Sequence, residues 1–279
     1  VGVNEMNYIN YEVNMAARGS YIVPGFNVFG YEDAQAVIHA AERHHSPVLL
    51  MVNRDARRAL ALEHWSALLG SLARNASVPV AVHLDHCSDL DDIFQAVDVG
   101  FHSVMYDGSK LPLEENIANT KRVAEYAHAR GVAVEAEVGT VPYSDMGEVT
   151  PEFTRPEEAA RMAAESGADW LAVSVGNIHR QTCRATRINF QRLEEIQKVC
   201  SLPLVLHGSS GVLAEDLAKV RSYRVGKVNI GTALRQVFGG TLRATVLANP
   251  NTFDRLTLLE QSCEQAEDKA YELIGQMVV

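Results

Sequence analysis

Eight short apolar segments rich in β-branched residues recur along the chain and alternate with longer segments of helical periodicity. Strands are expected at Tyr21–Phe29, Pro47–Val52, Pro79–Asp85, Ser103–Tyr106, Ala133–Gly139, Trp170–Gly176, Pro203–His207 and Lys227–Ile230. Helices are expected at Tyr31–His45, Ala61–Asn75, Leu90–Val99, Leu113–Arg130, Arg155–Ser166, Phe190–Val199 and Ala214–Ser222, with one more from Thr232 and a last one from near Asp254. Apolar strands separated by helical crossovers predict parallel strands that are buried on both faces.

The count of eight strands favours closure of this sheet into a barrel. A chain of 279 residues with 47% hydrophobic residues can fill either two small domains or one large α/β barrel. An open, doubly wound sheet is the alternative, but "PGFNVFGYED" stands where a glycine-rich dinucleotide fingerprint would follow the first strand. We therefore predict an α/β fold, a (β/α)8 TIM barrel with an additional C-terminal helix, as a single domain over residues 1–279.

The charge and the cysteines limit the partners and the compartment. A net charge of -10 without a Lys/Arg-dense stretch argues against nucleic acid and against an anionic membrane surface, although a local field can still attract a small anion. The cysteines form no C-x-x-C pair, which argues against a disulfide framework. No apolar run approaches the roughly 20 residues of a membrane helix, and the first residues lack the regions of a signal peptide. We expect a soluble, cytoplasmic protein.

Three histidines at strand ends predict a metal site. His86, His179 and His207 follow three different strands, and the C-terminal strand ends of a barrel converge on one mouth. Three neutral imidazoles with an open fourth position suit zinc or a similar divalent ion. Any one of them alone is more often a capped or exposed histidine. Asp85, one residue before His86, could exchange a proton with a substrate on the metal, or could only orient an imidazole.

The rest of "HLDHCSDLDD" is interpreted as structural. Ser88 and Asp91 have the spacing of a helix N-cap, and Asp89, Asp91 and Asp92 would favour the helix dipole. A Schiff-base lysine is disfavoured, because Lys110 and Lys227 are the only lysines near a strand end and Lys227 is expected to begin its strand.

Small residues after strands seven and eight predict a site for an anionic, phosphorylated ligand. "LHGSSG" and "VNIGTALR" end these strands, where barrels of this kind commonly bind phosphate. Glycines allow close backbone approach, and hydroxyl donors are available from Ser209, Ser210 and Thr232.

Several acids at strand ends leave their roles open. Asp107 and Glu137 could bind a second cation or only form structural hydrogen bonds, and Glu135 shares a strand face with Glu137, which requires a partner or a cation. In the loop after strand five, Asp145 and Glu148 could act from a lid or belong to a solvated loop.

From "YIVPGFNVF" to the last helix the sequence resembles the class II, metal-dependent ketose-bisphosphate aldolases, of the fructose- and tagatose-bisphosphate type. The motifs that carry the resemblance are "SPVLL", "HLDHCSDLDDI", "MYDGSKLPLEENI", "VEAEVG", "LAVSVGNIH", "INFQRLEEI", "PLVLHGSSG" and "KVNIGTALR", in family order.

The resemblance implies a lyase that cleaves a ketose 1-phosphate or 1,6-bisphosphate to dihydroxyacetone phosphate and an aldehyde through a zinc-stabilised enediolate. His86, His179 and His207 would bind Zn²⁺, or Co²⁺ or Mn²⁺ in its place, and Asp85 would be the acid/base. Asp107 and Glu137 match second-cation positions, and a monovalent cation is a further candidate. The substrate-binding candidates are Asn27, Arg180, Gly208, Ser209, Ser210, Asn229, Gly231 and Thr232. The family also suggests a homodimer or homotetramer formed through the C-terminal helices.

Three departures from the family pattern bear on the substrate. Arg180 stands where the family has a glycine after the second metal histidine. "TVPYSDMGE" lacks the family's Gly-Gly-acidic pattern, which leaves Asp145 and Glu148 as candidates for the second acid/base. Leu259 aligns with the arginine that binds the distal phosphate, with Arg255 one turn earlier. The alternatives are a phosphosugar-binding barrel without aldolase activity, acting as a sensor or scaffold, and a metal-dependent phosphosugar epimerase.

Overall fold

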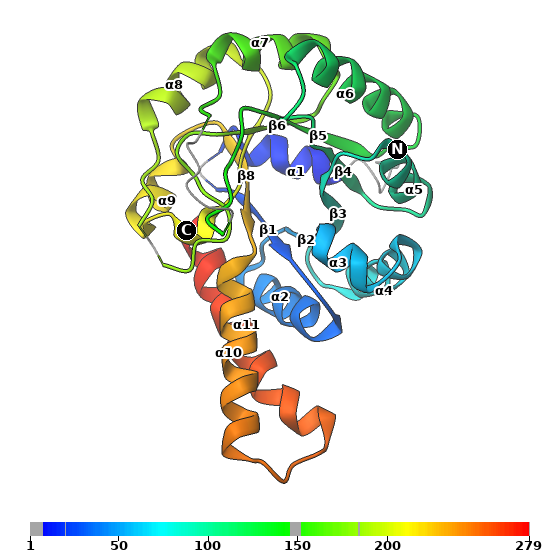
Figure 1. Ribbon diagram of the computed structural model, residues 1–279, viewed down its shortest axis with the longest axis vertical. Helices are drawn as coiled ribbons and strands as arrows, with labels where there is room; N and C mark the ends of the chain where they lie inside the picture. Colours follow the sequence, from blue (N-terminus) through cyan, green and yellow to red (C-terminus); the bar gives the residue numbers. More distant parts are fainter. Residues whose placement is uncertain (1–7, 20, 146–151, 184, 279) are drawn as a thin grey trace.

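The computed structural model of the chain describes residues 8–19, 21–145, 152–183 and 185–278. Eight parallel strands pair in sequence order, and β1 pairs with β8 to close the barrel (Figure 1). The strands are β1 (Val23–Asn27), β2 (Val48–Val52), β3 (Val80–Cys87), β4 (Ser103–Tyr106), β5 (Ala133–Val138), β6 (Trp170–Val173), β7 (Leu204–Leu206) and β8 (Val225–Ile230). The predicted TIM barrel is confirmed.

Helices follow the strands and form an outer ring. They are α2 (Tyr31–His44), α3 (Arg54–Ala59), α4 (Leu62–Asn75), α5 (Leu90–Asp98), α6 (Leu113–His128), α7 (Pro156–Glu165), α8 (Phe190–Val199), α9 (Ala214–Val220) and α10 (Thr232–Ala248), with a short 3₁₀ helix at Ser209–Gly211. The additional C-terminal helix is α11 (Arg255–Val278), which packs against α2 and α10. In Figure 1, α10 and α11 extend from the barrel as a helical hairpin. None of the described helices is long and apolar enough to cross a membrane.

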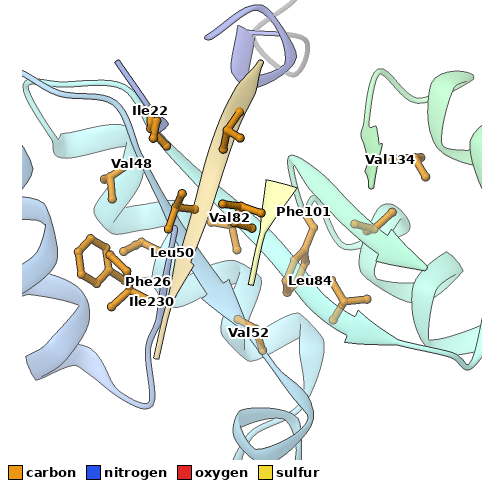
Figure 2. Packing of buried hydrophobic residues seen from close by; sticks show 14 of the residues in the cluster. Ile22, Phe26, Val48, Leu50, Val52, Val82, Leu84, Phe101, Val134 and Ile230 are labelled. Carbon is orange, nitrogen blue, oxygen red and sulfur yellow. The ribbon is translucent and has the colours of Figure 1, made fainter. Parts of the chain in front are cut away.

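Two layers of apolar side chains hold the barrel together. The outer layer lies between the strands and the helices and includes Ile22, Phe26, Val48, Leu50, Val52, Val82, Leu84, Phe101, Val134 and Ile230 (Figure 2). The inner layer fills the barrel with Leu49, Met51 and Trp170, and packs against α1 (Tyr8–Ala16) at the N-terminal end. α1 was not predicted from sequence; its Ile9 and Val13 are fully buried here. Alternate residues of each strand therefore enter different cores, as the two-residue period requires.

Three local expectations were wrong. β3 does not end at Asp85 but continues to Cys87 through a register shift, with His86 in left-handed backbone at φ 44°. The N-cap of α5 is Asp89, which accepts hydrogen bonds from the amides of Asp91 and Asp92, and not Ser88. Lys227 does not begin β8, since the strand starts at Val225; it lies inside the strand with a fully buried side chain.

Candidate functional site

A pocket of about 360 Å³ opens where the C-terminal strand ends converge. Its lining brings together nearly all of the site residues proposed from sequence: Asn27, Asp85, His86, Asp107, Glu137, His179, Arg180, Gly208, Ser209, Ser210, Asn229, Gly231 and Thr232. His207 is fully buried, and its ring centroid lies 4.6 Å from that of His86. Asp145 reaches the pocket through an ion pair with Arg180. Glu148 lies outside the described residues.

The three imidazoles of His86, His179 and His207 form one cluster. Each offers a nitrogen that lies within 4.8 Å of the others. These are His86 Nε2, His179 Nε2 and His207 Nδ1, which are buried and have no hydrogen-bond partner among the described residues. Buried, unpaired imidazole nitrogens are costly unless something fills the space between them. Three such nitrogens fit zinc or a similar divalent cation.

The opposite ring nitrogens of two of these histidines are held by carboxylates. His86 Nδ1 lies 2.9 Å from Asp107 Oδ2, and His207 Nε2 lies 2.8 Å from Glu135 Oε1. Burial lowers the pKa values of His179 and His207, and the neighbouring His86 lowers them further. Burial also opposes protonation of His86, but Asp85, Asp107 and Glu137 raise its pKa to about 10. A divalent cation would replace that proton as the charge that balances these acids.

A second set of ligand atoms adjoins the first. His86, Asp107 and Glu137 also place one ligand atom each within 4.8 Å of the others. Glu137 Oε2 is buried without a hydrogen-bond partner among the described residues. Burial, and then the charge of Asp107, raise the pKa of Glu137 to about 8. A buried carboxylate that is destabilised in this way could accept a cation.

Asp85 is buried beside the imidazole cluster and lines the pocket. Burial opposes its ionisation, but His86, His207 and Lys227 outweigh burial and lower its pKa. Asn229 Nδ2 donates to Asp85 Oδ1 at 3.2 Å and orients the carboxylate. The side chain can therefore act as a proton acceptor next to the cluster of three imidazoles.

Glu135, which requires a partner by its position inside the barrel, finds it in Lys227. The ammonium lies 2.5 Å from Glu135 Oε2 and 3.2 Å from His83 Nε2. Burial and then the Lys227 charge lower the pKa of His83 to about 3, so His83 is neutral. These three side chains lie beneath the pocket. Their contacts were not predicted, because Lys227 was expected to lie at the start of its strand.

The loops after β7 and β8 present small residues and a helix N-terminus. Gly208 has φ 62°, and a Cβ there would lie 2.4 Å from the carbonyl oxygen of Ile178. Ser210 Oγ accepts a hydrogen bond from the Ala233 amide at 3.1 Å in the first turn of α10. The Ser209 hydroxyl instead donates to the Asn229 carbonyl at 2.6 Å. The arrangement suits an anion near Gly208, Ser210 and the α10 N-terminus.

Arg180 closes one side of the pocket mouth. It has left-handed backbone at φ 58°, a conformation that favours the glycine expected there from the family pattern. Its guanidinium pairs with Asp145 at 2.8 Å and with Asp55 at 3.2 Å, and lies over the ring of Tyr143. The ring of Tyr143 in turn stacks on His179 with centroids 4.5 Å apart.

The pocket lining also includes residues that were not proposed from sequence, among them Asn53, Asp55 and Arg235. Asn53 caps α3 and Asp55 lies in its first turn, and this six-residue helix is too short for a periodicity signal. Arg235 lies within "VNIGTALR", one turn after Thr232, and this spacing was the available signal.

Comparisons with known proteins agree with this geometry. The family "Fructose-bisphosphate aldolase class-II" matches the chain over residues 8–278. The YdjI aldolase of Escherichia coli K12 is 32% identical, with 96% of each chain covered and a TM-score of 0.84. A candidate fructose-1,6-biphosphate aldolase of Coccidioides immitis is 28% identical, with 97% of this chain and 96% of that chain covered and a TM-score of 0.86. The fructose-bisphosphate aldolase of Campylobacter jejuni, 22% identical over 98% and 94% of the two chains with a TM-score of 0.84, shares the fold.

Proposed function

The chain belongs to the class II fructose-bisphosphate aldolase family, and we propose that it cleaves a ketose 1-phosphate or 1,6-bisphosphate into dihydroxyacetone phosphate and an aldehyde. Enzymes of this family are lyases that act on phosphorylated sugars. The observation that carries the proposal is a cluster of three imidazole nitrogens, without hydrogen-bond partners in the part of the chain that the structure describes, beside the buried carboxylate of Asp85. We propose His86, His179 and His207 as the cation ligands, with Asp107 and Glu137 as a second cation position.

A divalent cation at this cluster, zinc by family, would supply a Lewis acid that polarises the ketose carbonyl. Asp85 takes the proton of the C4 hydroxyl as the C3–C4 bond breaks. The electron pair of that bond moves toward C2, and the C4 oxygen becomes the aldehyde oxygen. Asn229 keeps the Asp85 carboxylate turned toward the reacting hydroxyl. In the reverse direction, Asp85 returns the proton to the new hydroxyl.

The phosphate of the dihydroxyacetone half would lie against Gly208, Ser210, Gly231 and Thr232. Support comes from the α10 N-terminus and from the absence of side chains at the two glycines, which allows the backbone amides to approach the phosphate. Asn27 and Asn229 each have a buried carbonyl oxygen without a partner among the described residues, which suits contacts to sugar hydroxyls. Ser209, whose hydroxyl bonds to the backbone, would contribute only through its main chain.

The distal end of the substrate would contact basic side chains at the pocket mouth. Arg54, Lys110, Arg180 and Arg235 line this rim, and they favour a polar or anionic group. The described pocket lining does not include Arg255, which pairs with Glu32 of α2, or Leu259. Asp145, held as a carboxylate by Arg180, is the described candidate for the second proton carrier.

The decisive experiment removes the metal and tests a panel of sugars. Turnover of ketose 1-phosphates and 1,6-bisphosphates should produce dihydroxyacetone phosphate, stop on treatment with a chelator, and return when Zn²⁺ or Co²⁺ is added. Full activity of the metal-free protein would contradict the proposed mechanism. An epimerised sugar without cleavage would indicate an epimerase, and binding without turnover of any sugar would indicate a sensor or scaffold.

The chain is also proposed to form a homodimer or homotetramer in a reducing, cytoplasmic compartment. Support for an oligomer comes from the α10–α11 hairpin, whose end exposes the apolar side chains of Leu247, Phe253 and Leu256. Support for a reducing compartment comes from the four cysteines, all of which are free thiols: Cys87, Cys183, Cys200 and Cys263.

A further inference from the structure

We propose that Lys227 is a positioning residue for the cation site: through Glu135 it holds His207 in the tautomer whose Nδ1 faces the cation. This inference rests on the proposed function, since it presupposes a cation bound by His86, His179 and His207. Lys227 and Glu135 are fully buried and are not among the described residues that line the pocket. Their hydrogen-bonded connection to the cluster of three imidazoles is through His207.

The contacts form a continuous chain across the barrel interior. Lys227 Nζ from β8 lies 2.5 Å from Glu135 Oε2 on β5, and Glu135 Oε1 lies 2.8 Å from His207 Nε2 at the end of β7. Each carboxylate oxygen thus has its own donor, and the two donors come from different strands. Two donors on separate oxygens fix the plane of the carboxylate and its direction toward His207.

The position of the hydrogen on His207 follows from this geometry. A carboxylate only accepts hydrogen bonds, so His207 Nε2 must carry the hydrogen, and the lone pair of the neutral ring is then on Nδ1. Nδ1 is the ring nitrogen that is buried and has no hydrogen-bond partner among the described residues. A carboxylate on the distal nitrogen of a metal-bound histidine both selects the tautomer and orients the ring.

Lys227 is itself held on a second side. Its Nζ lies 3.2 Å from His83 Nε2, and His83 Nδ1 lies 2.8 Å from Ser103 Oγ. Without the ammonium, Glu135 becomes a buried charge whose Oε2 has no hydrogen-bond donor among the described residues, with His83 Nε2 at 3.7 Å. The carboxylate is then free to turn away from His207. The network therefore connects the Lys227 charge inside the barrel to the proposed ligand nitrogen, His207 Nδ1, at the barrel mouth.

The test measures metal affinity in the full chain. Zinc binding is titrated against a chromophoric chelator for the wild type, Lys227→Met, Lys227→Arg and the core control Leu49→Ala, and the absorption spectrum of each Co²⁺ form is recorded. Lys227→Met should bind zinc about 10–100-fold more weakly and show an altered Co²⁺ spectrum. Lys227→Arg, which keeps the charge, should recover part of the affinity. Leu49→Ala, which opens the apolar inner core, should change neither property.

A double variant keeps the test decisive if Lys227→Met does not fold. Lys227→Met with Glu135→Gln leaves no unpaired buried charge, but an amide can donate or accept and no longer selects the His207 tautomer. The same weakening is expected. Wild-type affinity in either variant, or equal losses in Leu49→Ala, would overturn the role of Lys227. Absence of zinc binding by the wild type, or unchanged affinity in His207→Ala, would instead contradict the proposed function.

Discussion

Three buried acids at the residue scale show how neighbours decide a carboxylate's chemistry. Asp85, Glu135 and Glu137 all point into the barrel, and burial alone would raise the pKa of each. Lys227 and His207 lower the pKa of Glu135, and His86 and His207 lower that of Asp85. Glu137 instead faces Asp107, and its pKa rises to about 8. Of these three acids, Asp85 is the one that is both ionised and on the pocket wall, which suits the proton transfer that we propose for it.

Replacement of Asp85 by Asn tests this role at the residue scale. The amide keeps the size of the side chain, but it cannot accept the substrate proton. We expect kcat to fall about 10²–10⁴-fold, the range that general acid–base catalysis contributes. Zinc content, measured by atomic absorption, should stay at the wild-type level.

Asp91→Asn is the matched control, because Asp91 is exposed in the first turn of α5 and lies outside the pocket lining. Its kcat should equal that of the wild type. Loss of zinc from the Asp85→Asn variant would contradict the acid/base role and would indicate that Asp85 only orients His86.

At the scale of elements, the site depends on connections that only a glycine can make. The turn from β7 to the 3₁₀ helix passes through Gly208, whose backbone is left-handed and touches Ile178. This close approach brings the β6 loop with His179 against the β7 loop with Ser210. The helix that begins at Thr232 then completes the proposed phosphate site.

Gly208→Ala should therefore damage both stability and substrate binding. The new Cβ would lie 2.4 Å from a backbone oxygen, in a conformation that side chains rarely adopt. We expect a loss of about 1–3 kcal/mol in the free energy of unfolding and a raised KM for the sugar phosphate. Urea unfolding and steady-state kinetics provide the two measurements.

Gly239→Ala is the matched control for a glycine substitution. Gly239 lies within α10, and a Cβ there meets nothing within 4 Å. Alanine should stabilise the protein by about 0.5–1 kcal/mol and leave KM unchanged. Equal behaviour of the two variants would contradict the assigned role of Gly208.

At the scale of the whole molecule, the α10–α11 hairpin extends away from the barrel, although the C-terminal part of α11 is buried in the core through Leu273, Ile274 and Met277. It projects beyond the outer ring (Figure 1), and Phe253 at its end is 96% exposed. Leu247 and Leu256, 74% and 73% exposed, lie on the same hairpin. Several large apolar side chains exposed on one projecting element are typical of an association surface.

Substitution of the hairpin end tests the proposed oligomer. Leu247→Lys combined with Phe253→Glu places charges on the surface that would be buried between copies, so the sedimentation coefficient should shift to that of a smaller species. The Tm of the barrel should fall by no more than the contribution of the lost interface. A variant with Tyr11→Lys, another exposed aromatic residue but far along the chain in α1, should keep the wild-type sedimentation. An unchanged sedimentation coefficient for the double variant would exclude this surface as the interface.

The sequence by itself determined the strand order and hence which end of the barrel carries the site. Periodicity locates each strand, and parallel strands with helical crossovers place every C-terminal strand end on one side. His86, His179 and His207 could therefore be assigned to one mouth although they are far apart in the chain. The positions of Gly208, Ser210 and Thr232 followed from the same argument.

Only the tertiary structure decided what each side chain meets. The pairing of Lys227 with Glu135 requires the two residues to lie at the same height along the barrel axis. That height is set by the register in which neighbouring strands pair around the closed barrel, and the periodicity of a single strand does not determine this register. For the same reason, the α1 helix beneath the barrel and Asp55 beside Arg180 could not be predicted, since their contacts join segments that are distant in sequence. The His207 ring nitrogen that has no hydrogen-bond partner among the described residues is likewise a property of the assembled barrel, because the carboxylate that holds the other ring nitrogen comes from another strand.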